Sequence, residues 1–297
     1  MDSEVLAART MRSVGFRPAR KWRVIRVSLA TLHYLMVLAG AGFLLVPLAW
    51  MISTSLKDQI GAMAFPPRFI PDQFLWQNYK DVATLMPLAT YMKNTALITA
   101  LTIAGTTWSN SWVAYGFAKL RSRSRSFLFI VLLSTTMLPG QVTIIPLYKM
   151  FVNMGWLDTF KPLVVPAFFG SAFTVFLVRQ FYVTIPNQIL ESGRIDGCSE
   201  LRLYWQIMLP LSKPILVTIA VFAFMGAWND LFGPLIYISS DEKKTLALGI
   251  MMLKGMYNTE WHYLMALSLI AMLPCIIVFY FAQRYYLEGI VLGAVKG

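Results

Sequence analysis

The sequence contains few of the residues that build metal centres and disulfide frameworks, with only two cysteines and two histidines in 297 residues. Cys198 lies in a polar loop and Cys275 in an apolar run, so they do not form a plausible disulfide pair. Neither His33 nor His262 lies near a cysteine or a carboxylate cluster, so no metal site is predicted. No G-x-x-x-x-G-K-[ST] run occurs in the sequence, and any ATP that the protein uses must therefore be bound by a partner.

Charge is also scarce, because only 13% of the residues are charged while 57% are hydrophobic. This composition is too apolar for an ordinary soluble domain of this length. A membrane-spanning helix needs roughly 20 mainly apolar residues. The continuous apolar runs predict an all-α polytopic membrane protein, since open strands cannot satisfy their backbone groups in lipid. The six predicted spans are 28–53, 94–117, 126–147, 162–182, 214–238 and 263–285.

The net charge of +12 does not indicate nucleic-acid binding, because the basic residues lie next to the predicted membrane ends. Positive charge is retained on the cytoplasmic side of a membrane. If the N-terminal tail lies on the cytoplasmic side of the membrane, 17 of the 26 Lys and Arg residues are cytoplasmic and 9 are extracytoplasmic. The first apolar run exceeds the roughly 7 to 15 residues of a signal-peptide core, so we expect an uncleaved first helix. Both termini are predicted to be cytoplasmic.

These features divide the chain into consecutive segments. Residues 1–27 form a basic cytoplasmic tail, and 28–285 form the six-helix transmembrane domain. Within that domain, 57–93 is broken by four prolines and is too long for a simple turn, so it is predicted to be an extracytoplasmic cap. Residues 186–213 form a cytoplasmic loop, and 286–297 form a cytoplasmic C-terminal tail.

The cytoplasmic loop 186–213 is polar and charged within an otherwise apolar chain. Asn187 is the expected N-cap of a short helix that ends near Ile195. Gly197 permits a tight turn, and Ser199 can cap a second helix that ends near Met208. The loop is therefore predicted to be a helix-turn-helix that projects from the membrane.

The first helix of this loop places Glu191 and Ile195 on one face, and Ile189 and Gly193 on another. We expect small and apolar positions to be exposed there beside charged ones, which suits insertion into a groove of a partner. An amphipathic connector that lies against the membrane explains the same residue types equally well.

The order of residues in the loop resembles a known family. Glu191 is followed by Asp196-Gly197 and then by Ile207, Leu209 and Pro210. This pattern resembles the cytoplasmic EAA loop of the permease subunits of ATP-binding-cassette (ABC) importers. The chain departs from the pattern at Ser192, Gly193 and Cys198, which are all still small. Gly193 should weaken the helix by roughly 1 kcal/mol relative to Ala, and we expect a looser coupling helix that still docks.

The resemblance extends to the maltose-permease G-type subunits of carbohydrate importers. It includes Trp228-Asn229-Asp230, Gln283-Arg284-Tyr285 and the final Gly293-Ala294-Val295-Lys296-Gly297. It implies the type I ABC importer permease fold, in a bacterial cytoplasmic (inner) membrane. It also implies that Lys296 and Gly297 contact the ATPase. The residues that it implies for ATPase coupling are Leu190, Glu191, Ser192, Gly193, Arg194, Ile195, Asp196 and Gly197.

The implied partners are a homologous second permease subunit, an ATPase dimer, an extracytoplasmic sugar-binding protein and the lipid bilayer. ATP and Mg would be bound by the ATPase, so the chain itself is expected to be non-catalytic and without a cofactor. Movement of the ATPase would drag each coupling helix and switch the membrane half between inward-facing and outward-facing states. The substrates of such subunits include sugars, polyols and glycerol phosphates, and an acidic oligosaccharide of the alginate kind is one candidate.

Polar residues inside the spans are candidates for the translocation path, because they are costly in lipid and normally face a cavity or another helix. For Asn229 and Asp230 we favour a role in helix packing over a role in the path. Trp108 and Trp112 offer ring faces for sugars, although lipid or helix contact is the commoner use of such residues. The path candidates are Asn110, Gln141, Trp228, Asn229 and Asp230.

Two other function classes are weighed against the importer subunit. An ATP-independent secondary sugar transporter or channel should show intramembrane charge relays or inverted repeats, and neither is evident beyond Asp230. A membrane enzyme should show paired carboxylates, a Ser/His/Asp set or a metal cluster within the spans, and the spans contain none of these patterns.

Overall fold

The structure is a computed structural model and describes residues 20–254 and 259–294. Within these ranges the chain is helical, and its β structure is limited to an isolated bridge between Lys254 and Thr259. The chain divides into two compact units, residues 1–53 and 54–297. Lys296 and Gly297, which were predicted to contact the ATPase, lie outside the described residues.

The helices of the described residues differ widely in length, from three residues in α12 to 36 in α2. The α-helices are α2 (Arg20–Ser55), α3 (Gln59–Ala62), α4 (Gln77–Leu85), α5 (Leu88–Lys119), α6 (Arg125–Ser134), α7 (Gly140–Asn153), α8 (Lys161–Val164), α9 (Ala172–Thr184), α10 (Asn187–Ile195), α11 (Glu200–Leu203), α12 (Leu209–Leu211), α13 (Lys213–Trp228), α14 (Phe232–Tyr237), α15 (Leu246–Met252) and α16 (Trp261–Ala294). The other helical segments are η1 (Thr135–Met137), η2 (Val165–Phe169), the π-helical η3 (Tyr204–Met208) and η4 (Asp241–Lys243).

The first unit consists mainly of α2, a helix of 36 residues that contains Pro47. Residues 31–47 of this helix are all exposed, although most of them are apolar. Its segment Thr31–Ser55 has a mean hydropathy of 2.3. Such a helix matches the hydrocarbon thickness of a bilayer and satisfies its own backbone groups there.

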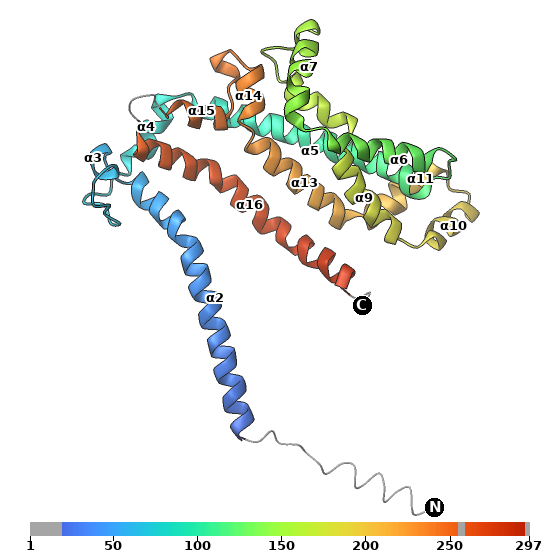
Figure 1. The fold of residues 1–297 in the computed structure, drawn as a ribbon, viewed down its shortest axis with the longest axis horizontal. Helices are drawn as coiled ribbons and strands as arrows, with labels where there is room; N and C mark the ends of the chain where they lie inside the picture. Colours follow the sequence, from blue (N-terminus) through green and yellow to red (C-terminus); the bar gives the residue numbers. More distant parts are fainter. Residues whose placement is uncertain (1–19, 255–258, 295–297) are drawn as a thin grey trace, which may run out of the picture. The chain divides into compact units, whose positions relative to one another are not determined.

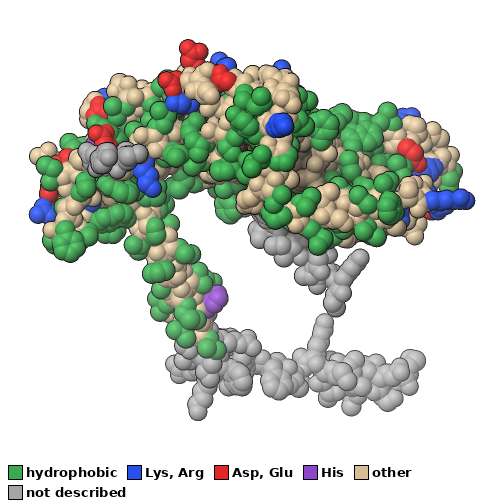
Figure 2. Space-filling view, turned by 45° about the horizontal axis from the view of Figure 1, so that its top comes forward, with side chains coloured by type: hydrophobic (Ala, Val, Ile, Leu, Met, Phe, Trp, Pro, Cys, Tyr) green, Lys and Arg blue, Asp and Glu red, His purple; other side chains and the backbone are tan. Residues whose placement is uncertain are grey.

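The second unit is organised around α5, which packs against α9 and α13, while α16 packs along α13 (Figure 1). Hydrophobic side chains cover much of the surface of this unit, and charged side chains gather mainly toward its ends (Figure 2). An apolar middle between two polar ends is the arrangement expected of helices that cross a bilayer.

The central helix α5 is polar for a membrane helix, and its polar side chains are used inside the bundle. Asn94 donates its amide to the carbonyls of Glu242 and Lys244, and Thr95 accepts the N–H of Leu246 at 2.8 Å. Ser109 donates to the carbonyl of Ala167 in η2 at 3.1 Å. These side chains tie α5 to its neighbours, because buried polar groups are stable only with hydrogen-bond partners.

The six predicted spans are partly confirmed by the lengths and composition of the helices. Three helices of the described residues are long and apolar enough to cross a membrane, Thr31–Ser55, Lys161–Thr184 and Trp261–Arg284. Two bent pairs raise the number to five if each pair is one span. The remaining predicted range, 94–117, lies within α5, which has 32 residues and is long enough to cross a membrane. Its Asn, Ser and Thr residues lower its mean hydropathy.

The predicted span 126–147 is bent rather than straight. It corresponds to α6, η1 and α7, and the segments before and after the break meet at 96°. Pro139 follows the break at Leu138, which is extended with ψ of 114°. A proline lacks an amide donor and pushes the residue before it out of the helical region, which explains the bend.

The predicted span 214–238 is too long at its C-terminal end. Helix α13 ends at Trp228, and a short turn leads to α14 at Phe232. The carboxylate of Asp230 accepts the N–H of Gly233 at 3.0 Å in this turn. Asn and Asp side chains compete for backbone donors in this way, so the apolar run alone did not reveal the end of the helix.

Candidate functional site

The loop between α9 and α13 begins with α10. Pro186 occupies the N-cap position, so the expectation that Asn187 is the N-cap is wrong. Asn187 is the first helical residue instead, and its Oδ1 accepts a hydrogen bond from Nζ of Lys119 at 2.9 Å. The same ammonium donates to the carbonyl of Ile185 at 2.6 Å. Lys119 at the end of α5 therefore binds the Asn187 side chain, which was expected to cap α10.

Helix α10 ends in a Schellman motif around Gly197. The N–H of Cys198 bonds the carbonyl of Gly193 at 2.9 Å, and the N–H of Gly197 bonds that of Arg194 at 3.1 Å. Gly197 has a φ of +81°. Only a residue without a Cβ adopts this left-handed conformation at little cost, which confirms the predicted turn at this glycine.

The second helix of the loop begins as the sequence predicts. The hydroxyl of Ser199 caps α11 by accepting the N–H of Arg202 at 3.3 Å. The chain continues through the π-helical segment Tyr204–Met208 and the short α12, and then bends by 78° into α13. Pro210 lies just after the π-helical segment and has no amide hydrogen to donate to a carbonyl of the preceding turn.

The two faces of α10 differ sharply in exposure. Leu190 is 1% exposed and Gly193 is also buried. A Cβ on Gly193 would lie 2.5 Å from Cδ2 of Leu203 and 3.2 Å from Cδ1 of Ile207. The expectation that Gly193 is exposed is therefore wrong, because its small size serves the close packing of α10 against α11 and η3.

The outer face of α10 is exposed at Glu191, Ser192 and Ile195. Ile195 is 86% exposed, an unusually complete exposure for a large apolar side chain in a charged loop. Arg194, Asp196 and Gly197 are exposed as well. Thus six of the eight predicted coupling residues lie on the surface, and the other two hold the helix in place.

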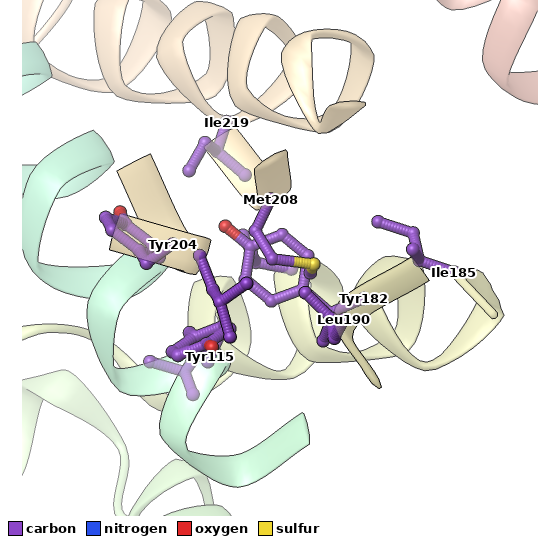
Figure 3. Close-up of a cluster of buried hydrophobic side chains, with 11 residues drawn as sticks. Tyr115, Tyr182, Ile185, Leu190, Tyr204, Met208 and Ile219 are labelled. Atoms are coloured by element: carbon purple, nitrogen blue, oxygen red, sulfur yellow. The ribbon is translucent and has the colours of Figure 1, made fainter. Parts of the chain in front are cut away.

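The inner side of α10 joins a cluster of buried side chains from six elements, α5, α9, α10, α11, η3 and α13 (Figure 3). Leu190 packs there with Tyr204 and Met208 of η3 and with Tyr182 of α9. The hydroxyl of Ser111 on α5 hydrogen-bonds the hydroxyls of both Tyr182 and Tyr204, at 2.6 and 2.7 Å. This network connects the loop to α5 and α9 within one buried core.

Glu200 connects α10 to α5, because its two carboxylate oxygens accept one hydrogen bond from each of these helices. Nε of Arg194 donates to Oε1 at 2.7 Å, and the hydroxyl of Tyr115 donates to Oε2 at 2.7 Å. These hydrogen bonds, that of Arg194 first, lower the pKa of the Glu200 carboxyl below its ordinary value. Glu200, Tyr115 and Lys119 were not predicted as site residues. The available signal was the Arg194 and Glu200 pair on either side of the Gly197 turn.

A cavity of about 380 Å³ lies beside this junction. Its walls carry both signs of charge, with Glu191 and Glu200 opposite in charge to the three basic residues. It is open to the surface and lies between the end of α5 and α10. The lining residues are Lys119, Leu120, Arg121, Glu191, Arg194 and Glu200.

Two of the five path candidates are buried and hydrogen-bonded within the chain. Asn110 is 1% exposed, and its Oδ1 accepts the N–H of Ser171 at 2.7 Å. Its amide donates to the carbonyl of Thr106 at 2.6 Å. Trp228 is 8% exposed, and its Nε1 donates to the carbonyl of Ala271 at 3.0 Å. Both side chains connect neighbouring helices.

The other three path candidates keep surface that another molecule can reach. Gln141 on α7 and Asn229 after α13 are exposed, and Asp230 is half-buried. The amide of Asn229 donates to the carbonyl of Met225 at 2.9 Å. Asn229 and Asp230 are adjacent, whereas Gln141 lies on a different helix, and the path assignment of all three stays a prediction.

Known proteins with similar sequences cover most of the chain. The family described as "Binding-protein-dependent transport system inner membrane component" matches residues 110–290. The probable ABC transporter permease protein YurM of Bacillus subtilis is 29% identical over 286 residues, which is 95% of this chain and 92% of that protein. The arabinooligosaccharides transport system permease protein AraQ of Bacillus subtilis is 33% identical over 204 residues, 69% of this chain and 72% of that protein.

Further similarity is found in other bacteria and in solved structures. The sn-glycerol-3-phosphate transport system permease protein UgpE of Yersinia pestis is 29% identical over 266 residues, 87% of this chain and 94% of that protein. A chain in a crystal structure of a bacterial ABC transporter "involved in the import of the acidic polysaccharide alginate" superposes with a TM-score of 0.73. That match covers 90% of this chain and 98% of the other at 22% identity, so it shows the fold alone.

The family match spans more than half of the chain and includes α9 to α13 with the whole loop. The helical architecture and the structural similarity show the type I ABC importer permease fold. The chain therefore belongs to the binding-protein-dependent transport system inner membrane component family, as a multi-pass inner-membrane permease.

Proposed function

We propose that the chain is the membrane-spanning permease subunit of an ATP-driven ABC importer that takes up a sugar or oligosaccharide. The substrate would be delivered by an extracytoplasmic solute-binding protein. The relatives include an arabinooligosaccharide permease and a glycerol-3-phosphate permease, which supports a small hydroxylated or anionic substrate. An acidic, alginate-like oligosaccharide is one candidate because the structurally similar chain comes from an alginate transporter.

One observation carries this proposal: α10 is anchored on its inner face and exposed on its outer face. Leu190 and Gly193 fill the junction with the bundle, while Ser192 and Ile195 point to an outer surface without apolar cover within the described chain. A short helix with one exposed apolar side chain among polar neighbours suits a groove on another protein. We assign residues 190–197 to the contact with a cytoplasmic ATPase subunit.

The energy for transport would come from that ATPase, which would bind ATP and Mg. The sequence of this chain contains no phosphate-cradling glycine motif, so its own part is mechanical and non-catalytic. With the loop facing the ATPase, both termini lie in the cytoplasm, and Lys296 and Gly297 are assigned to a second contact with it. Residues 57–93 would then face the binding protein.

A homologous second permease would complete the translocation path, since this chain supplies only one wall. We assign Gln141 to that wall, and we keep Asn229 and Asp230 as candidates for it beside the helix-packing role that the sequence favours for them. Asn110 and Trp228 support it from inside the bundle through their bonds to Ser171 and Ala271. Amide and carboxylate groups match the hydroxyl groups of a carbohydrate, because an amide donates and accepts hydrogen bonds and a carboxylate accepts them from the hydroxyl groups.

Cross-linking in native membranes tests the docking assignment. In a background with Cys198 and Cys275 replaced by Ser, a Ser192→Cys variant carries a small, exposed attachment point on the outer face of α10, and Asp72→Cys provides an exposed control on the cap. A short bifunctional thiol-to-amine reagent should join the Ser192 position to an ATP-binding subunit and leave the Asp72 position unjoined to it. Cross-links from both positions, or from neither, would contradict the assignment. Uptake that persists after ATP depletion would instead favour a secondary transporter.

A further inference from the structure

We propose that Glu200 is a positioning residue that fastens the docking helix α10 to the cytoplasmic end of α5, so that the two helices move as one body. This inference rests on the proposed function, because it assigns the route by which movement of α10 enters the membrane helices. The chain enters α10 from α9 and leaves the loop into α13. A mechanical route through α5 is therefore not implied by the connectivity.

The first link lies at the C-terminal end of α10. Arg194 in its last turn donates to one oxygen of Glu200, and Tyr115 of α5 donates to the other, both at 2.7 Å. A carboxylate accepts two such bonds at once, so one side chain connects two helices that do not follow one another in the chain. Tyr115 is 2% exposed, which fixes the α5 side of this link inside the core.

The second link lies at the N-terminal end of α10. Lys119 donates to the carbonyl of Ile185 and to Oδ1 of Asn187, at 2.6 and 2.9 Å. Tyr115 and Lys119 are four residues apart, so they lie on the same face of α5, one turn apart. That face of α5 therefore holds α10 at both of its ends.

The middle of α10 is fixed as well, because Leu190 packs in the buried core and Gly193 allows close contact with Leu203. Three points of attachment prevent the helix from rotating about any one of them. Helix α5 in turn packs against α9, α13, η2 and α15. A displacement of α10 that carries α5 with it would thus reach most of the second unit.

A purely local role for Glu200 must be distinguished from this one. Glu200 occupies the first turn of α11, where a negative charge is favourable at the helix N-terminus without any contact to α5. Tyr115→Phe removes the link to α5 and leaves that charge in place. Because Arg194 and Glu200 are 39% and 46% exposed, each single link should change the attached-to-detached equilibrium by only about two- to fivefold.

Pulsed EPR on the complex purified from native membranes into nanodiscs tests the attachment. Cys198 and Cys275 are replaced by Ser, and spin labels are placed at Val113→Cys on α5 and Ile189→Cys on α10, both 38% exposed in the native protein. Distances are measured without nucleotide and with ATP plus orthovanadate. The variants are Tyr115→Phe, Glu200→Gln and the two combined. Arg202→Gln is the matched control, since the side chain of Arg202 donates to Gln206 of the same loop at 2.9 Å.

We expect a narrow distance distribution that does not shift with ATP and vanadate in the native background and in Arg202→Gln. Arg194→Lys should keep it narrow, because a lysine can still pair with Glu200. The combined variant should broaden the distribution and make it depend on nucleotide. The inference is overturned if the native distance shifts with nucleotide, or if the combined variant matches Arg202→Gln. Absence of a co-purifying ATPase would overturn the proposed function instead, and the broadening could still be measured in the chain alone.

Discussion

Asp158 and Ser240 are joined across 82 positions of the chain, because the carboxylate of Asp158 accepts the backbone N–H of Ser240 at 2.9 Å. It also accepts the N–H of Ser239 at 3.0 Å, the hydroxyl of Ser240 and Nζ of Lys243. The backbone N–H of Asp158 donates a hydrogen bond to the carbonyl of Tyr237 at 2.8 Å. The connection after α7 is thereby fastened to the connection after α14.

The hydrogen bonds that clamp Asp158 to Ser239, Ser240 and Lys243 should make the folded protein less stable at low pH. The Ser240 hydroxyl, followed by the Ser240 and Ser239 N–H groups and Lys243, lowers the pKa of Asp158 well below its usual range. A carboxyl with a lowered pKa in the folded state contributes stability that is fully present above its unfolded pKa of about 3.9. That contribution is lost as the pH falls through the folded-state pKa.

Asp158→Ala should therefore speed amide exchange at Ser239 and Ser240 at neutral pH. Asp158→Asn should have a smaller effect, since Asn tolerates the φ of 53° at this position and still accepts hydrogen bonds. The measurement is hydrogen exchange by mass spectrometry for all three proteins, corrected for intrinsic exchange, from neutral pH to below the unfolded carboxyl pKa of about 3.9. Equal protection in Asp158→Ala and the native chain would contradict the clamp.

Gly197→Val should loosen the end of α10. The φ of +81° forces a β-branched side chain into a conformation that costs on the order of 1–3 kcal/mol. We expect lower recovery of the ATPase subunit on purification and less ATP-driven uptake, with unchanged membrane insertion. Gly226→Val is a control, because Gly226 has no neighbour within 4 Å of an added Cβ. An unchanged ratio of ATPase to permease in Gly197→Val would count against docking through this turn.

Ile195→Asp should weaken binding of the ATPase without unfolding the chain. The side chain is 86% exposed, so its replacement removes almost no internal contact, whereas an apolar anchor at an interface is commonly worth more than 1 kcal/mol. Ile60→Asp on the cap is matched in residue type and is 82% exposed. The check is the amount of ATPase that co-purifies with each variant. Equal losses in the two variants would point to general instability.

Asp230→Asn separates a role in the path from a role in packing. Asn keeps an oxygen that can accept the N–H of Gly233, so the turn after α13 and the folded complex should survive. Uptake should fall if the negative charge faces the substrate, while the yield of assembled complex stays the same. A loss of assembled complex in Asp230→Asn would instead support the packing role.

Ser111→Ala should destabilise the core beneath α10 by about 1–3 kcal/mol, because it leaves two buried tyrosine hydroxyls without their shared partner. Thermal unfolding of the purified protein measures this change. Ser134→Ala is a control for the loss of a serine hydroxyl outside the core, since Ser134 is exposed and its hydroxyl donates to the carbonyl of Ile130 within its own helix. Similar midpoints for Ser111→Ala and the native protein would show that the hydroxyl network contributes little.

Features that depend on neighbours in the chain were predictable from the sequence. The turn at Gly197 and the Ser199 cap follow from local backbone preferences, and the apolar runs gave three of the spans directly. The bend at Pro139 also has a local cause, since a proline pushes the residue before it out of the helical region, but the resulting 96° angle does not follow from the sequence. Backbone chemistry within a few residues is sufficient for such predictions.

Features that depend on contacts distant in the sequence were not predictable. Nothing near Asn187 indicates that Lys119, 68 positions earlier, takes its side chain. Gly193 was predicted to face a partner, but the position of Leu203 across the turn shows that it faces inward. The Tyr115 to Glu200 bond joins residues 85 positions apart. Such links require the packing of α5 against the loop to be known first.

The central claim is that this permease works with an ATPase through α10, and affinity purification from the native membrane in mild detergent tests it most directly. The co-purifying subunits are identified by mass spectrometry, and ATP hydrolysis is assayed with candidate sugar-binding proteins, loaded and empty. We expect a second permease, an ATPase dimer and hydrolysis that one loaded binding protein stimulates. Recovery of the chain alone, with gradient-driven uptake that needs no ATP, would contradict the account.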